Sequence, residues 1–255
     1  MADRLKGKIA LISGGATGCG AAAARLFAAE GAAVGIIDRN ERDGAALAAE
    51  LVKAGYRASF ARADVSKKSE VEGAVDQIVS ALGPINVLFN HAGTIVIKPF
   101  LETEEEDWDM LFDVNVKSMY LMTRAVLPHM LAQGKGAIVC TSSISAVYAT
   151  PMEVLYDATK GACHMFARAI AVEFRDRGIR CNAVCPGFTE TPLLDGAVPR
   201  GAGRRDEGDR HGTVPVGAIG VRQRTRPRSS TGRRIRSPHP VQGLLFPKER
   251  NIVSR

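Results

Sequence analysis

The sequence predicts an α/β fold in which a doubly wound parallel sheet is covered by helices on both faces. Short apolar runs rich in β-branched residues alternate along the chain with longer amphipathic stretches, as strands joined by helical crossovers do. The short runs are apolar almost throughout, which is typical of parallel strands buried on both sides. A glycine-rich turn at residues 13–20 directly follows the first run. Right-handed crossovers then produce one doubly wound domain.

Six apolar runs are the predicted strands. The first, "KIALIS", leads into the glycine-rich turn, and the second, "AVGIID", ends in an acidic residue. The third is "RASFARAD", which reaches Asp64. The last three, "INVLFN", "GAIVCTSS" and "IRCNAVCPG", again contain Val, Ile or Phe, which favour strands. In sequence order the predicted strands are residues 8–13, 33–38, 57–64, 85–90, 136–143 and 179–187.

The stretches between these strands predict helices. The first is rich in alanine, the residue with the highest helix propensity. The fourth opens with the acidic run "ETEEEDWD", which the positive end of a helix dipole stabilises. The predicted helices span about residues 20–30, a stretch ending at 54, then 68–82, 104–133 and 153–178.

Bulk composition predicts an ordinary soluble domain. The chain has 255 residues, of which 45% are hydrophobic and 24% charged. It has neither an apolar run long enough to cross a bilayer nor a signal-peptide core near Met1, so we expect a cytoplasmic protein without a membrane partner. Five irregularly spaced cysteines predict free thiols. The cysteines form no CxxC pair, so we expect no metal site.

Charge divides the chain near Asp195. Residues 1–195 hold 20 Lys and Arg against 23 Asp and Glu, whereas residues 196–255 hold 14 against 4, which together give the net charge of +7. We therefore predict a domain at 1–195 and an atypical basic segment at 196–255.

The glycine-rich turn "SGGATGCG" indicates a dinucleotide site. Gly14, Gly18 and Gly20 let the backbone approach a pyrophosphate, whose charge faces the N-terminus of the next helix. Asp38 ends the second strand, where a carboxylate accepts hydrogen bonds from the ribose hydroxyls and repels a 2′-phosphate, favouring NAD over NADP. The adjacent Arg39 could instead hold such a phosphate. A second alternative is that Asp38 only caps the following helix.

Six motifs occur in register after one another. In this order and spacing, the chain resembles the short-chain dehydrogenase/reductase family over residues 5 to about 195, which implies a Rossmann-like fold and a nicotinamide-dependent oxidoreductase. The motifs are "SGGATGCG" at 13–20, "NHAG" at 90–93, Asn115 in "FDVNVKS", "SS" at 142–143, "YDATK" at 156–160 and "PGFTETP" at 186–192.

The resemblance implies a catalytic set of Asn115, Ser143, Tyr156 and Lys160. Tyr156 would be the general acid/base, and Lys160, one helical turn away, would lower its pKa. Ser143 would hold the substrate oxygen, with Ser142 supporting the strand end. Asn115 would kink its helix and hold a water linked to Lys160. Without the other motifs, a tyrosine and a lysine at this spacing would be interpreted as an ordinary helix residue and a solvent-exposed surface residue.

The resemblance also implies the dinucleotide contacts. Asp64 and Val65 would touch the adenine, Asn90, Ala92 and Gly93 would lie behind the ribose, and Thr189 and Thr191 would fix the nicotinamide carboxamide. The sequence departs from the commoner motif at His91, for which we expect a backbone contact. The predicted cofactor-binding positions are Gly14, Thr17, Gly18, Cys19, Gly20, Asp38, Arg39, Asp64, Val65, Asn90, Ala92, Gly93, Tyr156, Lys160, Pro186, Gly187, Thr189 and Thr191.

The basic segment lacks what the family carries there, namely a substrate lid and a seventh strand. Seven arginines fall in residues 221–240. Four interpretations are open: an arm that binds nucleic acid, a disordered extension, an unusual ordered C-terminus, and a shifted reading frame. We favour the frameshift, because codons for residues 224–232 can be chosen that, read two bases later, encode Asp-Glu-Ala-Ala-Phe-Val-Asn-Gly.

The predicted function is hydride transfer between NAD(H) and a small secondary alcohol or ketone. The alternative is a dinucleotide-binding protein whose aberrant C-terminus impairs or abolishes catalysis. We expect no nucleic-acid partner. The family implies a homodimer or homotetramer, which this C-terminus puts in doubt.

Overall fold

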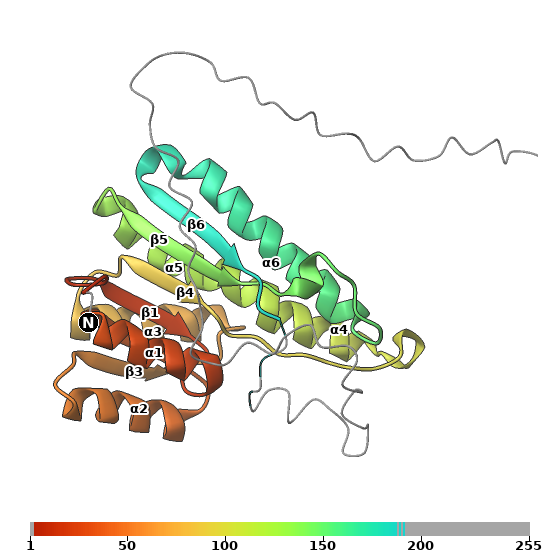
Figure 1. Ribbon diagram of the computed structural model, residues 1–255, viewed down its shortest axis with the longest axis horizontal. Coiled ribbons are helices and arrows are strands. Elements are labelled where there is room, and N and C mark those ends of the chain that lie inside the picture. Colours follow the sequence, from red (N-terminus) through yellow and green to blue (C-terminus); the bar gives the residue numbers. More distant parts are fainter. Residues whose placement is uncertain (1–2, 188, 190, 192–255) are drawn as a thin grey trace, which may run out of the picture. The chain divides into compact units, whose positions relative to one another are not determined.

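A computed structural model describes residues 3–187, 189 and 191. Its six strands form one parallel sheet in the order β3-β2-β1-β4-β5-β6. Because the chain returns from β3 to the far side of β1, the winding reverses between β1 and β4 (Figure 1). This confirms the predicted fold class. The strands are β1 (Ile9–Ser13), β2 (Ala33–Asp38), β3 (Ala58–Arg62), β4 (Val87–Asn90), β5 (Gly136–Thr141) and β6 (Ile179–Val184).

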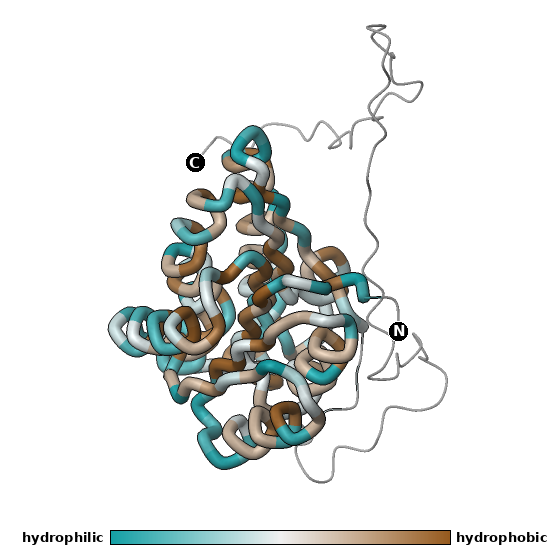
Figure 2. Tube along the Cα trace, turned by 90° about the vertical axis from the view of Figure 1, so that its left-hand side faces the viewer, coloured by the Kyte–Doolittle hydropathy of each residue, from teal (hydrophilic) through white to brown (hydrophobic). Residues whose placement is uncertain are grey.

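Helices cover the sheet in two layers. One buried cluster joins α1 and α2 to one face, and a second joins α3, α5 and α6 to the other. Figure 2 shows hydrophobic residues concentrated along the strands between these layers. The helices are α1 (Gly18–Ala29), α2 (Glu41–Lys53), α3 (Lys68–Leu82), α4 (Glu105–Phe112), α5 (Ser118–Ala132) and α6 (Val154–Glu173).

Alternate side chains of each central strand enter opposite clusters. Leu11 of β1 packs with α3 and α5, whereas its neighbour Ile12 packs with the alanines of α1. Both are fully buried. Two-sided burial is the reason that these strands are apolar throughout, and alanine lets α1 lie close to the sheet, as the positioning of its N-terminus requires.

The helix expected at 104–133 is interrupted. Between α4 and α5 lies a wide turn at Asp113–Lys117, in which the Ser118 N–H bonds to the carbonyl of Asp113, five residues back. Such π-type turns are rare in helices and frequent at functional sites. Asn115 lies at the centre of this turn and is fully buried. The N-terminus of α4 was correctly expected among the acidic residues, where the Glu104 side chain and Asp107 form a capping box.

One face of the last two strands differs from the rest. Ile138 and Cys181 are buried against the α6 layer, whereas Arg180 and Asn182 on the opposite face are exposed. Within the described part of the chain, β6 pairs only with β5. The predicted break near Asp195, the missing lid and seventh strand, and the basic segment at 196–255 lie outside the described residues.

Candidate functional site

A cavity of about 670 Å³ opens where the strands end. Carboxyl ends of parallel strands at a change of winding direction are the usual ligand site of such sheets. Most of the predicted residues, from all six motifs but the one with Asn115, meet around it. Those that line it are Gly14, Thr17, Gly18, Cys19, Asp38, Arg39, Asp64, Val65, Ala92, Gly93, Ser143, Tyr156, Lys160, Pro186, Gly187, Thr189 and Thr191.

Three predicted residues lie behind the cavity wall: Gly20, Asn90 and Asn115. Asn90 ends β4, and its amide donates to Thr123 Oγ1 at 3.0 Å in the core. The Asn90 side chain therefore packs in the core. Of the three residues predicted to lie behind the ribose, Ala92 and Gly93 line the cavity. Gly20 shapes the wall by close backbone packing, and Asn115 shapes it by hydrogen bonds.

The glycine-rich turn depends on close backbone packing. Gly14 has φ of +69°, and a Cβ there would lie 2.7 Å from the Cα of Ala92. A Cβ on Gly20 would overlap the carbonyl oxygen of Gly14. Thr17, the residue before α1, makes no side-chain cap, so the first N–H groups of α1 are not bonded by that side chain. A turn of this kind suits a pyrophosphate.

Asp38 connects the turn to the next loop. Its carboxylate accepts from Ala16 N at 3.0 Å and from Asn40 N at 2.9 Å. The N-cap of α2 is Asn40, whose side chain accepts from Asp43 N. Asp38 is therefore not the cap of α2, which removes the alternative left open by the sequence. Arg39 beside it is exposed and lines the same cavity.

Asp64 fixes the loop after β3. Its Oδ1 accepts from the Ser66 N–H at 3.0 Å and from Ser66 Oγ at 2.7 Å. Burial works against its ionised form, yet the two bonds from Ser66 and the charge of Lys67 hold the pKa of Asp64 below its usual value. Asp64 is therefore a fixed acceptor beside Val65 on the cavity wall.

Tyr156 and Lys160 lie on α6, one turn apart. The Lys160 ammonium is 5.4 Å from the centre of the Tyr156 ring and donates to the carbonyl oxygen of Thr141 at 3.1 Å. Burial raises the pKa of Tyr156 to about 12, although a hydrogen bond with Ser143 acts in the opposite direction. Burial therefore sets the direction of the shift of the Tyr156 pKa, which is opposite to the lowering expected from Lys160. Burial also lowers the pKa of Lys160.

The two serines after β5 have different contacts. Ser143 Oγ accepts from Ser145 N at 3.1 Å and faces the cavity. Ser142 Oγ donates to the backbone carbonyl of Lys160 at 2.9 Å. Ser142 thereby ties the end of β5 to α6, while Ser143 is the hydroxyl beside Tyr156.

Asn115 joins three segments behind the cavity. Its Oδ1 accepts from Thr94 N at 2.7 Å, and its Nδ2 donates to Thr94 O at 2.9 Å and to Thr159 Oγ1 at 3.0 Å. Cys163 Sγ donates to the Asn115 backbone carbonyl at 3.2 Å. The wide turn after α4 is thus fixed by contacts with α6 and with the loop after β4.

His91 makes contacts with both its ring and its main chain. Its Nδ1 lies 3.0 Å from Thr141 Oγ1, and its ring stacks on Phe89 with centroids 5.0 Å apart. The expected backbone contact is made by its main-chain N–H, to Ser13 Oγ at 3.1 Å. Burial and the charge of Lys160 lower the pKa of His91 to about 4.

Sequence patterns left several wall residues unassigned. Thr94 on the wall and the fully buried Thr159 behind it became visible only through their bonds to Asn115. Glu153 could have been found, because it lies three residues before Tyr156, and residues at this spacing share a helix face. It is 4% exposed and lines the cavity. Other unassigned residues of the cavity are Ile95, Met110, Val114, Thr141, Ile144 and Ser145.

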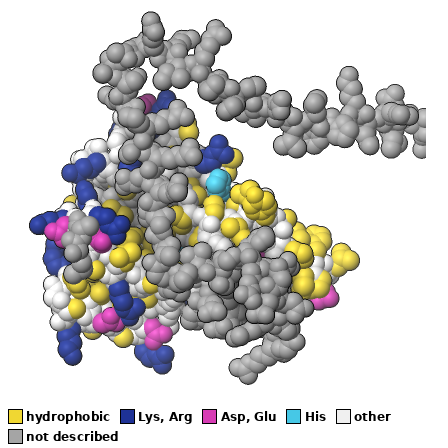
Figure 3. Space-filling model, in the orientation of Figure 1, with side chains coloured by type: hydrophobic (Ala, Val, Ile, Leu, Met, Phe, Trp, Pro, Cys, Tyr) yellow, Lys and Arg dark blue, Asp and Glu magenta, His cyan; other side chains and the backbone are white. Residues whose placement is uncertain are grey.

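Part of the cavity lining is apolar, through residues such as Ile95, Met110 and Val114. Figure 3 also shows hydrophobic side chains gathered on the surface beside α4 and the start of α6. In the described residues, the exposed large hydrophobic side chains include Leu101, Val147 and Tyr148, of which Leu101 is 95% exposed. A partly apolar lining with a few convergent polar groups suits a small organic ligand.

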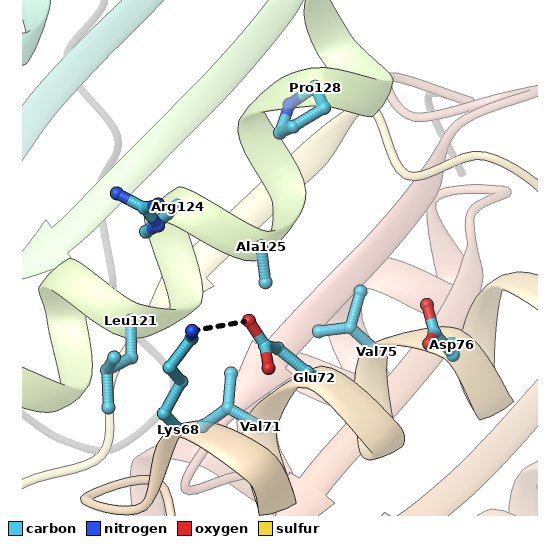
Figure 4. Close-up of a pocket in the computed structure, with 9 residues that line it drawn as sticks. All are labelled: Lys68, Val71, Glu72, Val75, Asp76, Leu121, Arg124, Ala125 and Pro128. Atoms are coloured by element: carbon cyan, nitrogen blue, oxygen red, sulfur yellow. Dashed lines mark ion pairs between the residues drawn. The ribbon is translucent and has the colours of Figure 1, made fainter.

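A second hollow of about 380 Å³ lies between α3 and α5 (Figure 4). Its rim carries an exposed ion pair between Lys68 and Glu72 at 3.7 Å, beside Arg124 and Asp76. None of the motif residues lines it. In the described ranges, no three His, Cys, Asp or Glu side chains gather as a metal site would need, and no helix there is long and apolar enough to span a membrane.

A family model described as short chain dehydrogenase matches residues 8–200. The cyclopentanol dehydrogenase of a Comamonas species is 40% identical over 190 residues, which are 74% of this chain and 76% of that protein. The 2,5-dichloro-2,5-cyclohexadiene-1,4-diol dehydrogenase of Sphingobium indicum is also 40% identical, over 78% of this chain and 80% of that protein.

Solved structures agree with these sequence relatives. A gluconate 5-dehydrogenase from Burkholderia cenocepacia, in complex with NADP and tartrate, is 36% identical with a TM-score of 0.74, covering 79% of each chain. A 3-ketoacyl-(acyl-carrier-protein) reductase from Brucella melitensis, complexed with NADH, is 35% identical with a TM-score of 0.71, covering 75% of this chain and 80% of that one.

Proposed function

The chain belongs to the short-chain dehydrogenase family, and from this premise we propose that it transfers a hydride between a nicotinamide cofactor and a secondary alcohol or ketone. The observation that carries the proposal is a single cavity, lined by the glycine-rich turn on one side and by Ser143, Tyr156 and Lys160 on the other. A dinucleotide and a small alcohol can therefore meet there.

The residues divide the chemistry of the substrate oxygen. A bound nicotinamide cofactor would supply the hydride chemistry, accepting a hydride from the alcohol carbon in oxidation. The phenolate of Tyr156 would take the hydroxyl proton as the carbonyl double bond forms. Ser143 holds the oxygen by a hydrogen bond. Lys160 supports the phenolate by its charge, and Asn115 fixes the segments on which the cavity wall depends.

The raised pKa of Tyr156 favours one direction at neutral pH. With a pKa of about 12, Tyr156 is a phenol there and can donate its proton to a ketone. Oxidation needs the scarce phenolate and therefore becomes faster as the pH rises.

The wall residues fit a nicotinamide dinucleotide. A Cβ at Gly14 or Gly20 would fill the space along which the turn approaches its neighbours, and the N-terminus of α1 opens toward the cavity through Gly18. The glycine-rich turn, Asp38 and Asp64 would hold the adenosine diphosphate half. Lys160, Thr189 and Thr191 would hold the nicotinamide half.

We propose NAD as the preferred cofactor. The support is Asp38, whose carboxylate is held on the cavity wall by two backbone N–H groups and would repel a 2′-phosphate. Arg39 offers the opposite charge on the same wall. Of the similar solved structures, one is in complex with NADP and one with NADH, so the choice must come from this chain's own residues.

The test of the reaction is Tyr156→Phe. Removing the phenol oxygen should lower kcat by about 10²- to 10⁴-fold, while the NADH dissociation constant, measured by fluorescence titration, changes less than about threefold. The matched control is Tyr120→Phe, which removes a phenol oxygen from α5 outside the cavity and should leave kcat unchanged. Full turnover by Tyr156→Phe would refute the mechanism.

The test of cofactor preference compares Asp38→Ala with Arg39→Ala. Losing the carboxylate should narrow the NAD-to-NADP ratio of kcat/KM by about tenfold or more, the effect of roughly 1.4 kcal/mol of lost repulsion. Arg39→Ala should leave the preference for NAD intact. If wild-type protein binds the two dinucleotides equally and Arg39→Ala loses NADP alone, Arg39 decides the preference instead.

A second candidate is a dinucleotide-binding protein with weak or no catalysis. It is favoured by the family match, which ends at residue 200 of 255. NADH binding without turnover of any cyclic or open-chain alcohol or ketone would establish it, and a salt-dependent DNA-binding assay would separate it from a nucleic-acid arm. The frameshift, the domain division near Asp195, the homo-oligomer and the cytoplasmic location stay predictions.

A further inference from the structure

The cavity wall carries an acid that the proposed reaction does not use. Glu153 is the residue immediately before α6 and is 4% exposed. Its side chain makes no cap to its own helix, although this is the usual role of an acidic residue at that position. Glu153 has an interaction partner within the protein and still lines the cavity together with Tyr156, so its carboxylate can also meet a ligand.

Two observations place this carboxylate at the reacting end of the cavity. Glu153 lines the same cavity as Ser143 and Tyr156. Its negative charge also contributes to raising the pKa of Tyr156, which requires the two groups to be near each other. The adenosine half, by contrast, is the part of the cavity lined by Asp38 and Asp64.

The lining of the cavity restricts what Glu153 can recognise. The same cavity is lined by the apolar side chains of Met110, Val114 and Ile144, which suit the carbon skeleton of a small alcohol. An ionised carboxylate has about four lone-pair sites and no donor, so it can accept from a ligand while keeping its contacts with the protein. It repels a ligand carboxylate in the same cavity.

We propose that Glu153 is a specificity-determining residue, which accepts a hydrogen bond from a second hydroxyl group next to the reacting carbon. The inference rests on the proposed function and refines its substrate class. The preferred substrates are neutral vicinal diols and hydroxyketones, and hydroxy acids are excluded. A hydrogen bond to a charged acceptor is worth about 10- to 100-fold in affinity.

Three ring alcohols of matched size test this assignment: cyclopentanol, 1,2-cyclopentanediol and 2-hydroxycyclopentanecarboxylate. For the wild-type protein, kcat/KM should be about tenfold or more higher for the diol than for cyclopentanol, and lowest for the acid. In Glu153→Gln, which keeps the shape and removes the charge, the diol preference should fall about tenfold and the acid should gain about tenfold. The control is Glu173→Gln at the exposed far end of α6, which should change neither ratio.

A binding measurement separates this inference from the proposed reaction. Dissociation constants of the diol and of cyclopentanol are measured by ligand-observed NMR on Tyr156→Phe in the presence of NAD, with and without Glu153→Gln. Diol selectivity that depends on Glu153 supports the assignment even if no alcohol is turned over. Equal binding of the two alcohols, or a selectivity that Glu153→Gln leaves unchanged, would overturn it, including in a protein that oxidises all three.

Discussion

One side of the cavity depends on the backbone of its residues, and the other side depends on their side chains. On the dinucleotide side, Gly14 and Gly20 contribute backbone that leaves no room for a Cβ. On the catalytic side, Ser143, Tyr156 and Lys160 contribute side chains whose surroundings set their protonation. The first side therefore depends on shape and the second on charge and burial. Substitutions should affect folding and cofactor binding on the first side, and rate and pH dependence on the second.

The largest expected effect tests the charge of the catalytic side. Since the pKa of Tyr156 is about 12, the phenolate fraction rises about tenfold per pH unit between pH 7 and 10. The kcat for alcohol oxidation should therefore rise about 10²- to 10³-fold over this range, while ketone reduction stays nearly constant. Initial rates in both directions, in buffers of constant ionic strength, check this. An oxidation rate independent of pH would show that another group takes the proton.

The next effect tests the shape of the dinucleotide side. Gly20→Ala places a Cβ against the carbonyl oxygen of Gly14, and overpacking of this kind costs about 1–3 kcal/mol. We expect a loss of about 3 kcal/mol in the free energy of unfolding and at least tenfold weaker NADH binding, measured by urea unfolding and fluorescence.

The matched control for Gly20→Ala is Gly73→Ala. A Cβ on Gly73, within α3, meets nothing within 4 Å. Alanine should there stabilise the protein by about 0.5–1 kcal/mol through helix propensity. If both substitutions destabilised equally, the cost at Gly20 would not come from the close approach in the turn.

How far the sequence predicted each region follows from the range of the contacts involved. All six strands were expected in their places. For β1, β2 and β4 the reason is that burial on both faces requires a local apolar run. The helix break at Asn115 was expected as a kink, but its form depends on Thr94 and Thr159, which no local pattern reveals. The pKa of Tyr156 was predicted in the wrong direction, since its spacing to Lys160 is visible in the sequence and its burial is not.

A smaller effect tests whether burial also sets protonation where the two sides meet. Folded His91 has a pKa of about 4, against about 6.5 unfolded. A histidine with a lowered folded pKa gives its full contribution above pH 6.5 and loses it as the pH falls toward 4. Between pH 7.5 and 5.0, it should cost the wild-type protein about 2 kcal/mol of unfolding free energy.

The variant His91→Asn removes this titration. Its urea-unfolding free energy should fall about 2 kcal/mol less than that of the wild-type protein between these pH values. The control His129→Gln on α5 should keep the wild-type slope. Equal slopes for His91→Asn and wild-type protein would mean that His91 is protonated in the folded state.

Because Cys163 Sγ donates a hydrogen bond to the carbonyl of Asn115, the accessibility of this thiol reports how often the wide turn after α4 separates from α6. Cys163 of α6 is fully buried against this turn, and Cys140 and Cys181 lie in the same core, whereas Cys185 is exposed. A thiol reagent should therefore modify Cys185 at once and reach Cys163 only when the turn and α6 separate. The labelling rate of Cys163, followed by mass spectrometry, therefore measures the rate at which the catalytic wall opens locally, and the measurement needs no substrate. A bound dinucleotide that holds the wall closed should lower the labelling rate of Cys163. The labelling rate of Cys185 should stay the same and serves as the internal reference.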